Sequence, residues 1–395
     1  MRFAMSTVFY GPTGRVVTRI ESPDMLLATY HVRAPWSDAL ARASALAIEQ
    51  SVEVPLEALK GVEGSRIKRD IVAHVEAIRR MEDGFEVVLG LAEETTGYEI
   101  SQLINMLYGN CSMHDDVELV DVELPDDYAS HFPGPQFGID GIRRLTGASG
   151  RALTCTAIKP QGSTIAHLVD LARTFALAGI DVIKDDHGLA DQSFSPFAER
   201  VPLVQRAVEQ ANRETGGHTQ YAPTFSGGPK AITEQLRVAR DCGVTMAMVV
   251  PMLVGLPVFR EMRDEFGIPL LAHPSFTLAR CFSPALLIGK IYRMLGADAV
   301  IFPNHGSRFA YSRETCSALV GHARRAWAGY AVSLPVPGGG MTPARVDEAI
   351  DEYGIDTMLL VGGGLLIAAD PEDPSVLLSH CRAFVDRVAS HASRV

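Results

Sequence analysis

Eight short apolar runs recur at near-regular spacing along the second part of the chain, and this rhythm limits the fold more than any other feature. Each run is almost continuously apolar, which is typical of a parallel strand covered on both faces. The stretches between them have amphipathic helical patterns, the crossovers that parallel strands need. The runs are 152–158, 181–186, 220–225, 246–251, 269–274, 299–304, 332–337 and 357–362.

Residues 150–395 therefore contain eight strand–helix units, and their length agrees with the roughly 250 residues of a (β/α)₈ barrel. A doubly wound open sheet is the alternative. The regular repetition favours closure of the sheet, so we predict an α/β chain whose C-terminal domain is a TIM barrel that carries the catalytic site.

Residues 1–130 have a different pattern, whose order is β-α-β-β-α-β. The helix expected over 37–50 places Leu40, Ala43, Leu46 and Ala47 on one face. Asp83-Gly84 suits the tight turn of a hairpin. The order predicts a ferredoxin-like α+β domain, joined to the barrel by a linker over 131–149. The remaining expected elements are a strand around 25–31, hairpin strands 67–78 and 85–91, a helix over 100–107 and a strand over 117–124.

Composition narrows the class of protein. The 395 residues carry 36 Lys+Arg against 47 Asp+Glu, a net charge of −11 without a basic run, so we expect no nucleic-acid partner. No apolar run approaches the roughly 20 residues of a membrane span. The start at Met1 lacks a signal-like apolar segment, so we expect a cytoplasmic protein. The 6 cysteines form no Cys-x-x-Cys pair and are predicted to be free thiols.

Polar residues gather just past the ends of the predicted strands, where barrels of this kind carry their chemistry. Lys184 and Asp186 share one face of the second strand, whereas Asp185 must point to the other. They form either a buried ion pair that orients a loop or part of a Mg²⁺ site with Asp186 as an oxygen ligand. His187 is either a further ligand, whose nitrogen would shift the preference toward Mn²⁺, Co²⁺ or Zn²⁺, or a hydrogen-bond donor to the ligands or a solvated loop residue that leaves a Mg²⁺ site completed by water. Other residues at these strand ends are Lys159, His273 and Arg308.

Two glycine triplets follow the last two predicted strands, at the corner where barrels commonly hold a phosphate on backbone N–H groups. Tight turns are the alternative explanation. The pair of triplets favours a phosphate site made by Gly338, Gly339, Gly340, Gly362 and Gly363.

With these residues in place, the chain resembles the RuBisCO large-subunit superfamily over nearly its whole length. The resemblance rests on the N-terminal β-α-β-β-α-β order, Thr156-Ala157-Ile158-Lys159-Pro160, the run from Gly179 to Asp186 and the two triplets. Its most specific part is Lys184-Asp185-Asp186, because the family carbamylates this lysine with CO₂ and binds Mg²⁺ there. The resemblance implies that Lys159 moves protons and that His273 lies near the phosphate end.

The resemblance also implies that Glu49 and Asn110 close the site of a neighbouring subunit, which predicts a homodimer with shared active sites. Departures from the family are equally informative. His187 stands where the family's third metal ligand is glutamate, Pro274 replaces a phosphate-binding arginine, and Arg308 takes the approximate place of a catalytic loop lysine. CO₂ fixation is therefore not expected, and the chain is similar to RuBisCO-like proteins, also called form IV.

The expected activity is metal-dependent enolate chemistry on a phosphorylated, sugar-derived substrate. We expect a lyase that decarboxylates, or transcarboxylates and hydrolyses, 3-oxo-isoapionate 4-phosphate in apiose catabolism. The alternative is an enolase or isomerase of methylthio-pentulose phosphates in methionine salvage. A sugar-phosphate sensor without catalytic activity is a third reading, against which the combination of Lys159, Lys184 and Asp186 argues.

Overall fold

The computed structural model describes residues 9–10, 15–17, 25–278, 280–309, 311–367, 369–370 and 373–392. The chain divides into two compact units: Met1–Phe132 with Leu278–Leu286, and Pro133–Thr277 with Leu287–Val395. The first boundary lies close to the one expected after residue 130. The predicted linker contains a helix of the second unit, so it is not a plain connection along its whole length.

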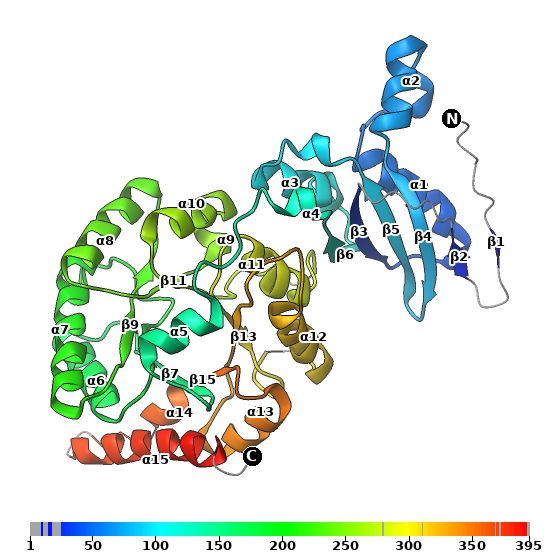
Figure 1. Cartoon of the computed structure of the whole chain (residues 1–395). Coiled ribbons are helices and arrows are strands. Elements are labelled where there is room, and N and C mark those ends of the chain that lie inside the picture. Colours follow the sequence, from blue (N-terminus) through cyan, green and yellow to red (C-terminus); the bar gives the residue numbers. More distant parts are fainter. Residues whose placement is uncertain are drawn as a thin grey trace. The chain divides into compact units, whose positions relative to one another are not determined.

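The first unit is built on an antiparallel sheet of strand order β1-β2-β4-β5-β3-β6 (Figure 1). Between β3 and β6 the order is β-α-β-β-α-β with an additional helix, α2, so the ferredoxin-like arrangement is confirmed. The strands are β1 (Phe9–Tyr10), β2 (Arg15–Val17), β3 (Leu26–Val32), β4 (His74–Met81), β5 (Gly84–Leu91) and β6 (Val117–Glu123), and the helices are α1 (Ala39–Glu49), α2 (Gly61–Asp70), α3 (Ile100–Tyr108) and α4 (Asp126–Ala129).

Three details of the first unit differ from the sequence prediction. The hairpin forms, but Met81 pairs with Gly84, so its turn is Glu82-Asp83. The expected start of its first strand at Ile67 is wrong, because that residue lies in α2, whose last turn carries cations favoured by the helix dipole. Leu40 is 48% exposed and does not belong to the buried face of α1.

The segment Leu278–Leu286 also belongs to the first unit, although it follows a barrel strand in sequence. The Leu119 N–H donates to the Cys281 carbonyl over 2.9 Å, and the Ser283 N–H donates to the Leu119 carbonyl over 2.9 Å. These two bonds attach the segment to β6. Apolar patterning gives no signal for this pairing.

The second unit is a parallel barrel with helices around it (Figure 1). In its described part, the strands coincide with all eight predicted runs. They are β7 (Leu153–Ile158), β8 (Val182–Asp185), β9 (Gln220–Ala222) with β10 (Thr224–Phe225), β11 (Ala247–Val249), β12 (Leu270–Ala272), β13 (Ala299–Pro303), β14 (Leu334–Gly338) and β15 (Met358–Leu360).

The barrel closes at two places between its component sheets. β9 and β10 are one strand interrupted at Pro223, which lacks an N–H donor; β9 pairs with β8, and β10 pairs with β11. On the other side, β14 lies against β15, since a Cβ built on Gly338 would lie 2.9 Å from a Leu360 side-chain atom. The TIM-barrel prediction is therefore confirmed, and the open sheet is not.

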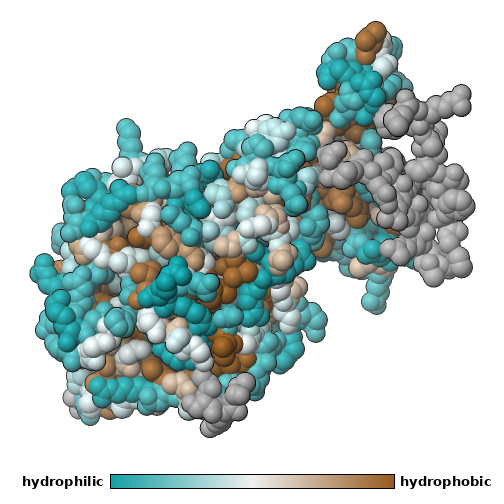
Figure 2. Space-filling model, viewed as in Figure 1, coloured by the Kyte–Doolittle hydropathy of each residue, from teal (hydrophilic) through white to brown (hydrophobic). Residues whose placement is uncertain are grey.

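Helices of the second unit cover the outside of the barrel (Figure 1), and the face of this unit seen in Figure 2 is largely hydrophilic with hydrophobic residues between. Among the described residues, no helix combines the length and apolar composition that crossing a bilayer requires. All six cysteines are free thiols, as predicted. The helices are α5 (Gly138–Thr146), α6 (Ile165–Leu177), α7 (Phe197–Thr215), α8 (Pro229–Asp241), α9 (Pro251–Val254), α10 (Leu256–Phe266), α11 (Tyr292–Met294), α12 (Arg313–Arg324), α13 (Val346–Tyr353), α14 (Gly363–Leu366) and α15 (Pro374–Ala392), with a π-helical segment over Ala285–Ile291.

Helix α5 closes the N-terminal end of the barrel. Its Ile139 and Ile142 belong to the same buried cluster as inward residues of the strands. Asp298, 1% exposed at the start of β13, accepts hydrogen bonds from three backbone N–H groups, those of Phe137 (2.6 Å), Gly138 (2.7 Å) and Leu270 (2.9 Å). The opposite end, where the strands finish, is left for polar residues.

Replacing Asp298 with alanine should lower the free energy of unfolding by about 3 kcal/mol, because three buried donors lose their acceptor at about 1–3 kcal/mol each. Denaturant unfolding followed by circular dichroism measures this loss. Asp241→Ala, at the exposed end of α8, should change stability by less than about 1 kcal/mol. An Asp298→Ala protein as stable as the Asp241→Ala control would show that the carboxylate does not hold α5.

Candidate active site

Lys184 is buried inside the barrel near the end of β8. Its side chain is 2% exposed, and Nζ donates a hydrogen bond to the Asp185 carbonyl over 3.1 Å. Burial lowers the pKa of Lys184 because the charged form loses hydration, while the nearby Asp186 carboxylate opposes this shift. A buried amine with a lowered pKa spends more time uncharged than a surface lysine does.

The two carboxylates after Lys184 point to opposite sides of the barrel wall, as the pleat of the strand predicts. Asp185 is fully buried and accepts hydrogen bonds from Arg200 of α7 (3.1 Å), the Tyr221 hydroxyl (2.7 Å) and the Thr224 N–H (3.1 Å). Asp185 therefore fastens α7 and β9 to β8. Asp186 is only half-buried and lies at the mouth of the barrel.

Lys159 lies at the end of β7, and its side chain reaches toward Asp186. Its Nζ is 3.4 Å from Asp186 Oδ1. A Cβ built on Gly362 would also lie 3.4 Å from Lys159 Nζ, so this lysine reaches the second glycine triplet after β15. One amine thus connects the ends of three neighbouring strands, and the structure brings Lys159, Asp186 and Gly362 together as the sequence predicts.

Two histidines meet across the mouth. The rings of His187, after β8, and His273, after β12, are stacked with centroids 4.3 Å apart and planes 14° apart. Burial lowers the pKa of His273 well below its usual value, and the charge of Lys184 adds to this effect. Partial loss of hydration also lowers the pKa of His187, although 43% of its side chain is exposed. Both imidazoles are therefore held predominantly neutral at neutral pH.

A divalent metal fits these donors under one condition. With Lys159 and Lys184 both as ammonium groups, the charges beside Asp186 would repel a cation. A carbamate on Lys184 would replace one of those charges with an oxygen ligand of the kind Mg²⁺ prefers. The uncharged amine favoured by burial is the form that combines with CO₂, so the donor set is compatible with this modification.

The loop after β13 packs on the first glycine triplet. Gly339 and Gly340 adopt φ angles of +68° and +69°, and a Cβ on Gly340 would come within 2.9 Å of Ser307. Phe309 lies 3.6 Å from the corresponding position on Gly339. Arg308 is exposed in this loop, with its guanidinium 5.0 Å from the Phe309 ring centroid. The positive φ angles favour glycine at both positions, and at Gly340 the close approach of Ser307 leaves no room for a side chain either.

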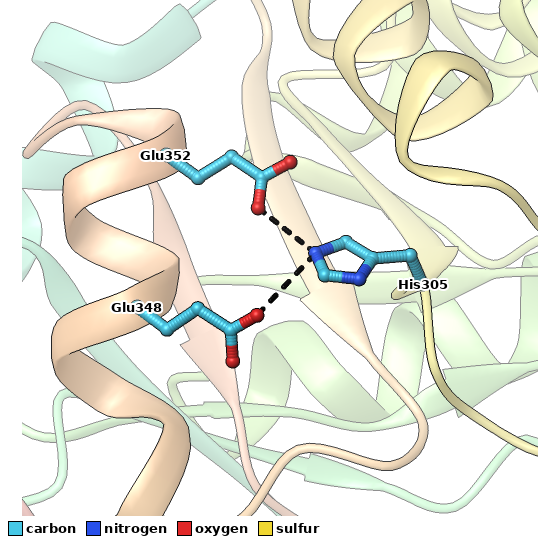
Figure 3. Close-up of side chains that lie close together, drawn as sticks. All are labelled: His305, Glu348 and Glu352. Atoms are coloured by element: carbon cyan, nitrogen blue, oxygen red, sulfur yellow. Dashed lines mark hydrogen bonds and ion pairs between the residues drawn. The ribbon is translucent and has the colours of Figure 1, made fainter.

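The base of this loop is fastened to α13 by a cluster that the sequence analysis missed (Figure 3). His305 Nε2 lies 2.8 Å from Glu352 Oε2 and 3.9 Å from Glu348 Oε1. Arg313 contacts Glu352 at 3.0 Å, and Arg345 contacts Glu348 at 3.0 Å. Two guanidiniums thus balance both carboxylates, which makes the cluster an anchor for the loop instead of a cation site. The four-residue spacing of the two glutamates on one helix was the available signal.

The predicted residues of the N-terminal domain also meet, within the first unit. Asn110 Nδ2 donates to Glu49 Oε1 over 2.7 Å, which joins the end of α1 to the turn after α3. Both side chains are partly exposed. The pair presents a carboxylate and an amide on the surface of this unit.

Comparisons with known proteins agree with this architecture. Residues 138–300 match the family model of the ribulose bisphosphate carboxylase large chain, catalytic domain. A Rhodospirillum rubrum protein named 5-methylthioribulose-1-phosphate isomerase is 48% identical over 374 residues, covering 94% of this chain and 98% of that protein. A Geobacillus kaustophilus 2,3-diketo-5-methylthiopentyl-1-phosphate enolase is 32% identical over 276 residues, 68% of this chain and 67% of the enolase.

A crystal structure of a Rubisco-like protein from Rhodopseudomonas palustris matches with a TM-score of 0.85 and 44% identity, covering 93% of this chain and 98% of the other. A parallel barrel with polar residues at its strand ends defines the broad class of (β/α)₈-barrel proteins. The chain belongs to the ribulose bisphosphate carboxylase large-chain family, and within it to the RuBisCO-like proteins.

The two adjacent carboxylates provide a sharp test of this site. Asp185→Asn should lower the free energy of unfolding by about 3–5 kcal/mol, because Arg200 is left as an unpaired buried cation. Asp186→Asn should change it by less than about 1 kcal/mol yet remove activity. Thermal and denaturant unfolding measure the first effect and steady-state kinetics the second. Equal loss of stability in both variants would contradict the assignment.

Proposed function

We propose that this chain is a methionine-salvage enzyme that isomerises a methylthio-pentulose phosphate by proton transfer. The observation that carries the proposal is the convergence of Lys159, Asp186 and the buried Lys184 at the ends of β7 and β8. Such a set can remove a proton next to a carbonyl and stabilise the enolate that results. A sensor of sugar phosphates would need no groups of this kind beyond its phosphate contacts.

The similar proteins support this substrate class over the expected apiose pathway. The relative at 48% identity is named as an isomerase of 5-methylthioribulose 1-phosphate, and the one at 32% identity as an enolase of 2,3-diketo-5-methylthiopentyl 1-phosphate. Neither name includes a decarboxylase. The expectation of a lyase acting on 3-oxo-isoapionate 4-phosphate therefore has less support than its alternative.

The proposed reaction conserves every atom of the substrate. A proton leaves the carbon beside the carbonyl, and the C–H electron pair moves so that the carbonyl oxygen becomes an enediolate oxygen. A proton then adds to the former carbonyl carbon, whose oxygen becomes a hydroxyl, while the hydroxyl on the carbon that lost the first proton gives up its own proton and becomes the new carbonyl. Lys159 carries the proton in this scheme, with Asp186 at 3.4 Å as the partner that balances its charge.

A hydrogen-bond donor and a metal site would assist this reaction. Neutral His273 can donate a hydrogen bond to a substrate oxygen without adding a full charge to the mouth of the barrel. Asp186 and a carbamylated Lys184 would hold a divalent cation, Mg²⁺ by preference, which supplies Lewis-acid stabilisation of an enolate oxygen when bound.

The substrate phosphate would be held by the backbone N–H groups of the two glycine triplets. Gly362 lies beside Lys159, so a phosphate near this triplet would place the sugar carbons within reach of the amine. Pro274 offers no guanidinium for a second phosphate. A singly phosphorylated ligand therefore suits this chain better than a bisphosphate.

The proposal is tested by incubating the enzyme with 5-methylthioribulose 1-phosphate in D₂O and following the products by NMR. We expect an isomeric ketose phosphate, with deuterium entering at the carbon that is reprotonated and without CO₂ release. Lys159→Met should lower kcat by about 100-fold or more, with stability within about 1 kcal/mol of wild type. Lys230→Met, an exposed lysine on α8, is the matched control and should keep full activity.

A parallel incubation with 3-oxo-isoapionate 4-phosphate separates the two readings. CO₂ release from that acid, with no conversion of the methylthio sugar, would reject the isomerase and favour decarboxylation. If the Lys159→Met variant instead turns over the methylthio sugar at the wild-type rate, the proposed reaction is retained but Lys159 does not carry its proton.

We also propose a homodimer in which Glu49 and Asn110 of one subunit complete the site of the other. Asn110→Ala and Lys159→Met should each be inactive alone. After mixing under conditions that exchange subunits, about a quarter of the sites would combine two intact halves, so activity should recover toward that level. Size-exclusion chromatography with light scattering verifies the dimer. Absence of recovery in a verified mixed dimer would argue against shared sites.

A further inference from the structure

The stacked pair of His187 and His273 is a contact that the family resemblance does not lead one to expect. His187 follows β8 and His273 follows β12, and these strands are separated by β9/β10 and β11 around the barrel. The ring centroids are 4.3 Å apart, and the planes are within 14° of parallel. The contact therefore spans the mouth from one side of the barrel to the other.

His273 is also held from its own loop. The Ser275 N–H donates a hydrogen bond to His273 Nδ1 over 3.2 Å. A nitrogen that accepts a hydrogen bond carries no proton, so the ring proton of neutral His273 is on Nε2. With Nδ1 fixed by Ser275 and one ring face covered by His187, the Nε2–H donor has a defined direction.

The nitrogens of His187 make no comparably close contact with the predicted metal ligand. Nδ1 is 3.9 Å from Asp186 Oδ1, beyond hydrogen-bond distance, and Lys159 Nζ lies nearer to that same oxygen at 3.4 Å. Imidazole is also a poor match for Mg²⁺, which takes oxygen ligands. The close contact of His187 is therefore the stacking of its ring face on His273.

We infer that His187 is a positioning residue whose ring holds His273 in its donor orientation, and that His187 is not a metal ligand in this chain. The inference deepens the proposed function, and its kinetic readout rests on that function. A stacking platform needs a flat ring but no nitrogen, whereas a metal ligand needs the donor atom but no ring. The two roles therefore respond oppositely to two substitutions.

The matched variants are His187→Phe, which keeps the ring and removes the nitrogens, and His187→Glu, which restores the family's oxygen ligand and removes the ring. Mn²⁺ alone is titrated by electron paramagnetic resonance into bicarbonate-treated enzyme. The His273 tautomer is read from ¹⁵N imidazole shifts, and kcat and KM are measured separately. Only the last measurement depends on the substrate being correct.

For His187→Phe we expect the Mn²⁺ Kd, the Nε2–H tautomer of His273 and kcat to stay within about threefold of wild type. For His187→Glu we expect kcat to fall by about tenfold with little change in KM, the scale of losing one aromatic contact. The tautomer signal should become mixed, because a His273 ring without the stack can turn away from the Ser275 N–H. If Phe at this position impairs folding, as judged by circular dichroism, His187→Trp is the second ring-retaining variant.

A loss of Mn²⁺ affinity of tenfold or more in His187→Phe, with affinity kept or raised in His187→Glu, would establish a ligand role and overturn the inference. An unchanged His273 tautomer in His187→Glu would overturn it as well. If the wild-type enzyme does not isomerise the methylthio sugar, the proposed function fails, and the NMR measurement still decides the role of His187.

Discussion

The alternation of side chains along β8 is the constraint on which the rest of the site depends. Asp185 and Asp186 are neighbours in sequence, and the pleat sends them to opposite sides of the barrel wall. The outward carboxylate accepts hydrogen bonds from Arg200, Tyr221 and Thr224, so it stabilises the barrel wall. The inward carboxylate stays available to Lys159 and the mouth. A shift of one residue along this strand would exchange the two roles.

Burial of an amine beside that strand end sets the chemistry. Lys184 has lost most of its hydration, and its pKa is lowered by burial despite the nearby Asp186 carboxylate. The same low-polarity surroundings keep His273 neutral. A mouth containing one half-buried lysine, one buried lysine and two imidazoles with lowered pKa values supports proton transfer next to a carbonyl better than it supports simple ion binding. The proposed function is therefore proton chemistry.

Rigid attachment of the surrounding loops complements these groups. The loop after β13 is anchored through His305 to the two glutamates of α13, and its outer part packs on Gly339 and Gly340. At the opposite end of the barrel, Asp298 secures α5. The chemistry is thus separated from the part of the barrel that supports it, as in other TIM barrels.

Sequence alone determined the eight barrel strands and their order, because short apolar runs separated by amphipathic helices indicate which residues are buried. It also placed Lys159, Lys184, Asp186 and His273 at one rim, since parallel strands end on the same side. The sequence prediction was wrong where an apolar pattern favours a strand but the chain forms a helix, as at Ile67, which was predicted to begin a strand and lies in α2. Only the tertiary structure decided which side chains meet: the His187–His273 stack, the His305 anchor and the pairing of Leu278–Leu286 with β6 join residues distant in sequence. Such contacts follow from the closure of the barrel and the packing of its loops, which no local pattern encodes.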